Sequence, residues 1–237
     1  MIVVGLTGSI GMGKSTAAAM LRRMRVPLFD ADGVVHRLLA PSGAAVVRVE
    51  AAFPGACDER GGIDRRRLGQ RVFGDPPALG RLEQILHPMV ADAERRFLAL
   101  ARARHERLAV LDVPLLYESG GAGRCAYVIV VSAPAMLQRQ RVMRRPGMTE
   151  ARFAAILAQQ MPDAEKRRRA DFVVPSGLDR GLSLRRLRAI IRQLRSIEPR
   201  PASLAQRRLA RQRQARMRQR QARMRQRQAF MRQRQAR

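Results

Sequence analysis

The feature that most constrains this chain is a glycine-rich segment near its start, GSIGMGKS at residues 8–15. Its spacing is Gly-x-x-x-x-Gly-Lys-Ser, and it lies between an apolar run of strand length, residues 2–6, and an alanine-rich segment typical of a helix. A strand, such a loop and a helix in this order are the context of a phosphate-binding P-loop. The sequence therefore predicts an α/β fold built around a nucleotide site, in preference to a glycine-rich turn that binds nothing.

The residue types of this loop match the chemistry of phosphate binding. Glycines let the backbone turn with its N–H groups toward an anion, because a Cβ would crowd the phosphate. The helix that follows presents its positive N-terminal end. We expect Lys14 to reach the β- and γ-phosphates and the Ser15 hydroxyl to bind Mg²⁺. The predicted nucleotide-binding residues are Gly11, Met12, Gly13, Lys14, Ser15 and Thr16.

Short apolar runs alternate with helical patterns along the next part of the chain. This alternation predicts a parallel sheet with helices on its faces and right-handed crossovers. The expected strands are residues 2–6, 26–30, 108–113, 127–131 and 172–174. The expected helices are residues 15–25, 34–39, 44–53, 64–73, 75–105, 134–144, 149–160 and 182–197.

One stretch, residues 60–105, contains no strand pattern. We therefore expect a helical insertion between the second and third strands. Asp64 and Asp75 are expected to cap its helices. Pro88 lies inside the longer helical pattern, so we expect a kink or a break beside His87.

Two carboxylates follow the second expected strand, Asp30 and Asp32. Ligands of parallel sheets bind outside the carboxyl ends of the strands, and residues two apart on an extended chain point to the same side. A carboxylate here could take the proton of a substrate hydroxyl, as kinase aspartates do. The alternative is that these residues only cap the following helix.

An arginine cluster, with Arg139, Arg141, Arg144 and Arg145, precedes Pro146 and Gly147. Planar guanidinium groups bind phosphate oxygens in pairs and stabilise the charge that spreads over them during transfer. A short segment of this kind between two helices, about residues 141–150, resembles a lid that closes over ATP and excludes water. A solvated basic face is the alternative.

The net charge of +28 is unevenly distributed. Residues 199–237 contain 14 arginines and no acidic residue, which is half of the excess. From residue 211 they repeat RQRQARM with little change, and Ala215 and Met217 fall on opposite sides of a helix rather than on one coiled-coil seam. We interpret this segment as a disordered tail, with RNA or other polyanion binding as the alternative.

Other features exclude several classes of protein. No apolar run approaches the roughly 18 residues of a membrane span, and the first residues do not have the pattern of a secretion signal. Cys57 and Cys125 are the only cysteines and lack metal-site spacing, so we expect a reducing, cytoplasmic environment.

Several further motifs are spread over about residues 1–195. They are GLTGSIGMGKST at 5–16, FDAD at 29–32, IDR at 63–65 with Leu68 and Phe73, LEQILHP at 82–88, VPLLYE at 113–118, Gln138 with Arg141, Gln160, and ADFVV at 170–174. The Asp-Ala-Asp, His-Pro and Pro-Leu-Leu-aromatic-Glu motifs are more selective than the P-loop. In order and spacing, this set of motifs resembles the dephospho-CoA kinase family.

This resemblance implies a domain at residues 1–198 with a P-loop kinase core, a helical substrate-binding insertion at about 60–105 and a lid at about 141–150. It implies transfer of the ATP γ-phosphoryl group, with Mg²⁺, to the ribose 3′-hydroxyl of dephospho-CoA, which gives coenzyme A and ADP. The implied catalytic residues are Asp32 as the base, Lys14, Arg141 and Arg145. Asp30 becomes a helper, and His87 lies in the acceptor-binding insertion.

Some residues depart from the family pattern. Pro175 and Ser176 stand where the family often has Asn, and nothing in the family matches the tail after about Ile197. Asp112 lies where a carboxylate could hold Mg²⁺ through water. Two alternative functions stay open: a P-loop kinase of other nucleotides or nucleosides, and a nucleic-acid-binding protein whose tail carries the function.

Overall fold

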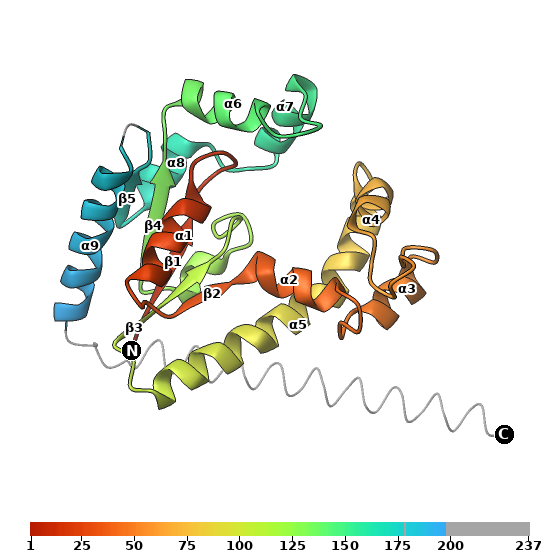
Figure 1. Ribbon diagram of the computed structural model, residues 1–237, viewed down its shortest axis with the longest axis horizontal. Helices are drawn as coiled ribbons and strands as arrows, with labels where there is room; N and C mark the ends of the chain where they lie inside the picture. The colour runs from red at the N-terminus through yellow and green to blue at the C-terminus, as the bar shows by residue number, and fades with distance from the viewer. Residues whose placement is uncertain (178, 198–237) are drawn as a thin grey trace. The chain divides into compact units, whose positions relative to one another are not determined.

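The computed structural model describes residues 1–177 and 179–197. They form a five-stranded parallel sheet in the order β2-β3-β1-β4-β5, with helices around it (Figure 1). The strands are β1 (Ile2–Thr7), β2 (Leu28–Asp30), β3 (Leu108–Asp112), β4 (Tyr127–Ser132) and β5 (Phe172–Pro175). The predicted α/β fold and all five predicted strands are confirmed, whereas the predicted disordered tail at 199–237 lies outside the described residues.

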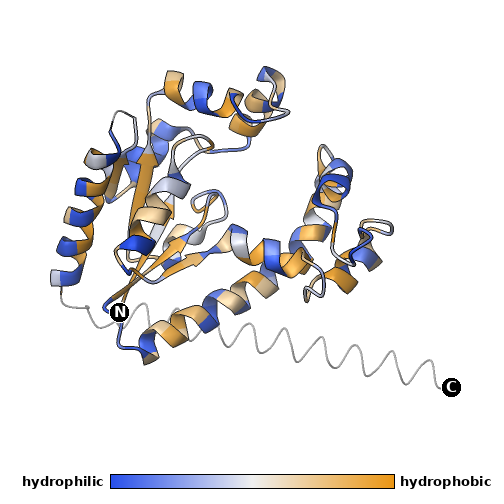
Figure 2. Ribbon diagram, viewed as in Figure 1, coloured by the Kyte–Doolittle hydropathy of each residue, from blue (hydrophilic) through white to orange (hydrophobic). Residues whose placement is uncertain are grey.

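The sheet is covered on both faces, which explains why its strands are continuously apolar. On one face Val4 and Leu6 pack with α1 (Lys14–Arg23) and α9 (Arg180–Ser196). On the other face Phe29 and Leu111 pack against α5 (Pro76–Ala103), where the Phe29 and Phe97 ring centroids are 5.6 Å apart. Figure 2 shows the consequence, because the strands are mostly orange while the helices alternate between orange and blue.

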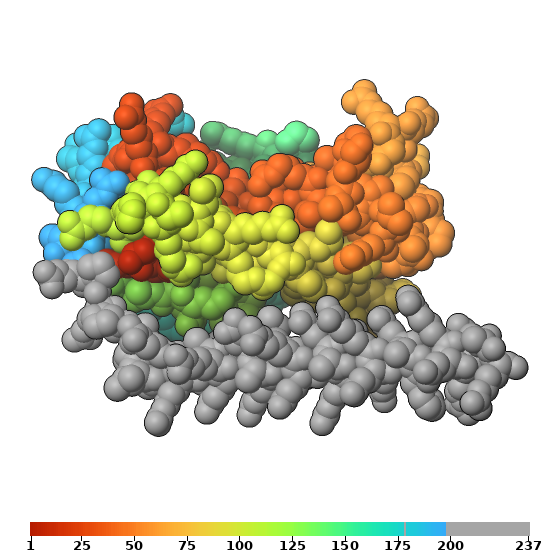
Figure 3. Space-filling view, turned by 90° about the horizontal axis from the view of Figure 1, so that it is seen from below, coloured from red at the N-terminus to blue at the C-terminus, as the bar shows by residue number. Residues whose placement is uncertain are grey.

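The helical insertion has an apolar core of its own. This core extends beyond the predicted bounds of 60–105, because α2 (Ala31–Leu39) and α3 (Val46–Ala52) build it together with α4 (Arg65–Val72) and the first half of α5. The buried residues of this insertion core are Leu39, Ala45, Val49, Phe53, Ala56, Ile63, Leu68, Ala78, Leu82 and Leu86. In the space-filling view, the yellow atoms of α5 run alongside the orange atoms and reach toward the red atoms of the N-terminal segment (Figure 3). Helix α5 therefore links the insertion to the sheet.

The caps of the insertion helices are those expected from the sequence. The Asp64 carboxylate accepts from the amides of Arg66 and Arg67, and the Asp75 carboxylate accepts from the amide of Ala78. Helix α5 nevertheless continues through Pro88, so the chain does not break beside His87. Proline removes one amide donor from the helix, and 28 residues anchored on two cores tolerate that loss.

Three further helices lie at the P-loop end of the sheet: α6 (Ala135–Met143), α7 (Glu150–Ala158) and α8 (Asp163–Arg169) (Figure 1). A 3₁₀ turn, η1 (Gly121–Arg124), precedes β4. The sequence did not predict α8, because the side chain that this helix buries is Lys166, so it lacks an apolar stripe. Among the described helices, none combines the length and the apolar character that crossing a membrane requires.

Candidate functional site

The glycine-rich segment links β1 to α1 in the geometry that its sequence predicted. Gly11 and Gly13 have φ values of 76° and 84°, which residues other than glycine rarely adopt. A Cβ on Gly11 would also lie 2.6 Å from Cγ2 of Val142. Lys14 and Ser15 begin α1, so their amides have no intrahelical acceptor and are free for an anion.

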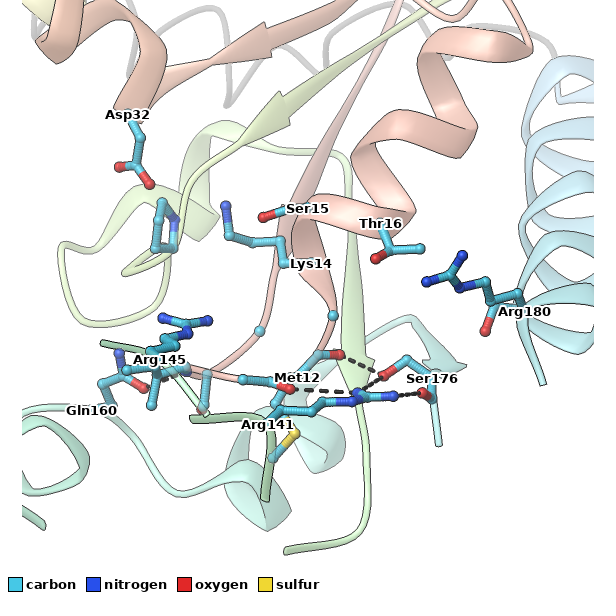
Figure 4. A pocket seen from close by; sticks show the side chains of 17 residues that line it. Met12, Lys14, Ser15, Thr16, Asp32, Arg141, Arg145, Gln160, Ser176 and Arg180 are labelled. Carbon is cyan, nitrogen blue, oxygen red and sulfur yellow. Dashed lines mark hydrogen bonds between the residues drawn. The ribbon is translucent and has the colours of Figure 1, made fainter. Parts of the chain in front are cut away.

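This loop forms one wall of a cavity of about 500 Å³. All the residues predicted to bind nucleotide line it, together with Asp32, Arg141 and Arg145 (Figure 4). The structure thus brings the predicted residues together, although what each one does stays a prediction. The lining residues are Gly8, Ser9, Ile10, Gly11, Met12, Gly13, Lys14, Ser15, Thr16, Asp32, Pro114, Arg141, Arg145, Gln160, Ser176, Arg180 and Ser183.

Lys14 is paired with a carboxylate from the neighbouring strand. Its Nζ lies 2.6 Å from Oδ1 of Asp112, the last residue of β3, which is buried. Burial raises the pKa of Asp112 above its ordinary value, although Lys14 opposes this shift. The pair therefore holds the lysine ammonium group beside the loop.

Asp30 and Asp32 lie on different elements, because the chain is not extended between them. Strand β2 ends at Asp30 and α2 begins at Ala31, so Asp32 lies in the first helical turn and reaches the cavity. Asp30 caps this helix by accepting from the Gly33 amide at 2.8 Å, and it pairs with Arg22 at 2.9 Å. The expected extended chain at Asp32 was wrong, and the helix-capping alternative applies to Asp30.

The environment of Asp30 also differs from that of a proton acceptor. Partial burial raises its pKa, but the Gly33 amide and the Arg22 guanidinium outweigh burial. The pKa of Asp30 therefore lies below its ordinary value. Both oxygens of this carboxylate are already engaged, which leaves Asp32 as the carboxylate that lines the cavity.

Arg141 and Arg145 approach the loop from α6 and the segment after it. The Nη2 atom of Arg141 donates to the carbonyl of Ser176 at 2.6 Å, and its Nη1 donates to the Ser176 hydroxyl at 3.2 Å. The same Nη1 lies 3.4 Å from the Gly11 carbonyl. Arg141 thus joins the P-loop to the end of β5, whereas Arg145 lines the cavity opposite Asp32 (Figure 4).

The structure adds lining residues that the sequence did not assign to the site. The Ser176 hydroxyl donates to the Met12 carbonyl at 2.6 Å, although its place after β5 gave it no sequence signal. Arg180 and Ser183 come from the start of α9, and Gln160 follows α7. Gln160 was part of the family pattern, but only the fold shows which wall it joins.

The residues present fit a magnesium ion bound together with a nucleotide. Ser15 and Asp32 bring a hydroxyl and a carboxylate to the cavity, and oxygen atoms of this kind are the ligands Mg²⁺ prefers. In residues 1–177 and 179–197 there is no group of three or more His, Cys, Asp or Glu residues that could hold a metal by itself. Magnesium at nucleotide sites needs only one or two protein ligands, because water and phosphates supply the others.

Known proteins resemble this chain over most of its length. A family model described as dephospho-CoA kinase matches residues 2–178. A dephospho-CoA kinase of Rhodospirillum rubrum is 57% identical over 188 residues, which are 79% of this chain and 89% of that protein. A dephospho-CoA kinase of Mesorhizobium japonicum is 59% identical over 178 residues, 75% of this chain and 88% of that protein.

Solved structures agree with these matches. A crystal structure of a protein from Thermus thermophilus has a TM-score of 0.69 and 37% identity, and covers 81% of this chain and 97% of that one. The dephospho-CoA kinase of Campylobacter jejuni has a TM-score of 0.57 at 23% identity, with 81% and 96% covered, and supports the fold alone.

Proposed function

We propose a function from the premise that this chain belongs to the dephospho-CoA kinase family, as the family match over residues 2–178 establishes. The chain transfers the γ-phosphoryl group of ATP to the ribose 3′-hydroxyl of dephospho-CoA. The products are coenzyme A, at the last step of its synthesis, and ADP. One observation carries the proposal beyond the family name: Asp32 lines the same cavity as the P-loop, whereas Asp30 is engaged as a helix cap.

The P-loop side of the cavity binds the donor. Backbone amides from Gly11 to Thr16 surround the ATP phosphates, and the start of α1 adds its positive end. The Lys14 ammonium, which pairs with Asp112 in the structure, binds the β- and γ-phosphates when ATP is present. When bound, Mg²⁺ supplies positive charge to the phosphates, and the Ser15 hydroxyl holds it.

Asp32 acts on the acceptor. Its carboxylate accepts the proton of the ribose 3′-hydroxyl as that oxygen attacks the γ-phosphorus, and ADP leaves from the opposite side. The proton moves to Asp32, and the bond from the γ-phosphorus to the bridging oxygen breaks. The enzyme contributes chiefly position and charge, because phosphoryl transfer requires little covalent chemistry from the protein.

Arg141 and Arg145 have different roles in the lid, about residues 141–150. Arg145 lines the cavity and stabilises the charge on the transferring group. Arg141 donates to Ser176 and the P-loop, so it holds the lid base against the loop as well as adding positive charge. Closure of the lid over ATP excludes water, which would otherwise hydrolyse the donor.

The acceptor binds between this cavity and the helical insertion, about residues 60–105. We place the reaction in the cytoplasm and assign no membrane partner. The matched family model ends at residue 178, so it does not address the basic tail at 199–237. A role for that tail in nucleic-acid binding remains an alternative addition, and nothing in the comparisons supports it.

The test is coupled ATP turnover of the full chain with dephospho-CoA as acceptor, beside a panel of nucleosides and nucleotides. We expect ADP release that depends on dephospho-CoA, and coenzyme A as the product. Turnover with another acceptor alone would favour a different P-loop kinase. A variant that ends at residue 198 should turn over like the full chain, and loss of activity would give the tail a part in the reaction.

A further inference from the structure

Two glutamine side chains form hydrogen bonds to the backbone of one P-loop residue, Ile10. The Ile10 amide donates to Oε1 of Gln160 at 3.0 Å. The Ile10 carbonyl accepts from Nε2 of Gln138 at 2.8 Å. Both backbone groups of Ile10 are therefore committed to side chains that lie 128 and 150 residues away in the sequence.

Gln138 is placed by α6. Its side chain is buried, and its backbone carbonyl lies so close to the loop that a Cβ on Gly11 would be 2.9 Å from it. Gln138 does not line the cavity. Any effect of this residue on nucleotide binding therefore passes through the shape of the loop.

Gln160 is placed by an ion pair next to it, between the buried Lys166 and the more exposed Glu118. The amide of Met161 donates to Oε1 of Glu118 at 2.8 Å, and the same oxygen lies 2.9 Å from Nζ of Lys166. Lys166 is fully buried. Partial burial raises the pKa of Glu118, but the Lys166 ammonium and the Met161 amide outweigh burial and hold that pKa below its ordinary value.

This anchor is specific as well as strong. A buried ammonium group without its partner would be costly, so Lys166 keeps Glu118 in one place. Glu118 in turn fixes the chain at Met161, the residue after Gln160. The loop after β3, the start of α8 and the P-loop are thereby joined through one short segment.

We propose that Gln138 and Gln160, here called the glutamine clamp, are positioning residues that hold the P-loop in its phosphate-binding shape, with the Lys166–Glu118 pair as the anchor of Gln160. This inference rests on the proposed function of the loop as the ATP site. By turning the Ile10 amide toward Gln160, the clamp fixes the path of the residues that follow. A loop that is already ordered loses less entropy when it binds phosphates, so the clamp strengthens ATP binding.

The test uses Gln138→Met and Gln160→Met in the full chain, because methionine keeps the length of the side chain but lacks the amide. Gln140→Met on α6 and Gln159→Met at the end of α7 are matched controls, since both glutamines are exposed and neither lines the cavity. The measurements are the ATP dissociation constant by calorimetry, both KM values, kcat and Tm.

We expect each clamp variant to weaken ATP binding about tenfold, as the loss of one well-placed hydrogen bond would. In the clamp variants the KM for dephospho-CoA should change by less than about twofold. In the control variants the ATP dissociation constant should also change by less than about twofold. Equal ATP dissociation constants in the clamp variants and the controls would overturn the proposal. If the wild-type chain itself neither bound ATP nor phosphorylated dephospho-CoA, the proposed function would fail instead.

A second variant, Gln138→Glu, separates positioning from a general packing effect and serves if Gln138→Met does not fold. A glutamate can donate to the Ile10 carbonyl only when it is protonated. Its ATP affinity, relative to wild type, should therefore recover as the pH falls toward about 5. A constant ratio across pH would contradict the assigned hydrogen bond.

The anchor has its own test in Glu118→Gln, which keeps an acceptor for Met161 but removes the charge that faces Lys166. We expect weaker ATP binding, and little further loss when Gln160→Met is added, because the two changes release the same segment. Fully additive losses would show that the ion pair does not act through Gln160.

Discussion

The contacts inside the P-loop end of the sheet differ in kind from the contacts inside the helical insertion. At the P-loop end, polar side chains join segments far apart in sequence, as Gln160 joins Ile10 and Arg141 joins Ser176. In the insertion, side-chain hydrogen bonds join segments that are close in sequence, as Glu50 joins Cys57 and Arg71 joins Pro54. An apolar core packs its short helices together and leaves Phe73 exposed. The end that we propose to bind ATP is thus held by hydrogen bonds with defined partners, whereas the insertion, which we propose to bind the acceptor, is packed mainly through apolar side chains.

This difference follows from what each half must bind. Phosphates need donors placed within a few tenths of an ångström, and only hydrogen bonds with defined partners supply such placement. Apolar packing has no directional preference, so an insertion built on it supports a surface without specifying polar contacts. Mutations should therefore act on chemistry in one region and on stability in the other.

The largest expected effect is that of Asp32→Asn. This variant should bind ATP like wild type but lose about a thousandfold in kcat, because an amide cannot accept the proton of the 3′-hydroxyl. Single-turnover kinetics and ATP calorimetry check both parts. Asp30→Asn is the matched control, and its kcat should stay within about threefold of wild type because asparagine still caps α2.

The next effect is that of Lys14→Ala. We expect kcat/KM for ATP to fall about a hundredfold, since a charge that faces the phosphates is lost. The variant also leaves Asp112 buried without its counter-charge, so the pKa of Asp112 should rise further. Arg22→Ala, on the same helix but outside the cavity, is the control. Equal values of kcat/KM for ATP in the two variants would show that Lys14 does not contact the phosphates.

A change in the insertion core should reverse this pattern. Leu82→Ala removes a buried side chain and should lower the free energy of unfolding by about 2 kcal/mol. The ATP dissociation constant should stay within about twofold, because the insertion core shares no residue with the cavity. Leu79→Ala, on the same helix and 40% exposed, should cost much less. Denaturation curves of both variants with and without ATP test this prediction. A loss of ATP affinity in Leu82→Ala as large as its loss of stability would contradict it.

The smallest effect concerns pH and the cap of α2. Because the pKa of Asp30 is lower in the folded chain than its ordinary value, the unfolded chain binds more protons there. The stability that Asp30 adds is present above about pH 4 and is lost as the pH falls through the lower folded value. Its size should be below about 1 kcal/mol, since Arg22 and Asp30 are partly exposed.

Unfolding free energies of wild type and Asp30→Asn, measured between about pH 6 and 3, test this sign. Their difference should shrink as the pH falls. If this difference in unfolding free energy grew toward low pH, the pKa of Asp30 would be raised in the folded chain. Its contacts with Gly33 and Arg22 would then not stabilise its charged form.

The sequence predicted what depends on local pattern. The strands are continuous apolar runs, the P-loop is defined by three glycines and a lysine, and Asp64 and Asp75 precede the helices they cap. The same local reasoning failed for Asp30 and Asp32, because the strand changes into a helix between them, at Ala31. That position cannot be read from a spacing of two residues alone.

Contacts between distant segments were beyond the sequence. Ser176 reaches Met12 across 164 residues, and nothing in a proline and a serine after a strand indicates this. Helix α8 was missed for a related reason, since its buried residue is a lysine that only its partner Glu118 explains. The family pattern included Glu118 and Gln160 without a physical reason, and the fold supplies one.

The two ion pairs beside the P-loop have a practical consequence for covalent labelling. Lys14 and Lys166 are the only lysines in a chain that carries 45 arginines. The Lys166 side chain has no exposed surface, whereas that of Lys14 is 15% exposed. An amine-reactive reagent therefore meets a single accessible lysine, and that lysine lines the cavity that we propose as the ATP site. The rate of acylation at one residue, followed by mass spectrometry, becomes a direct footprint of nucleotide occupancy.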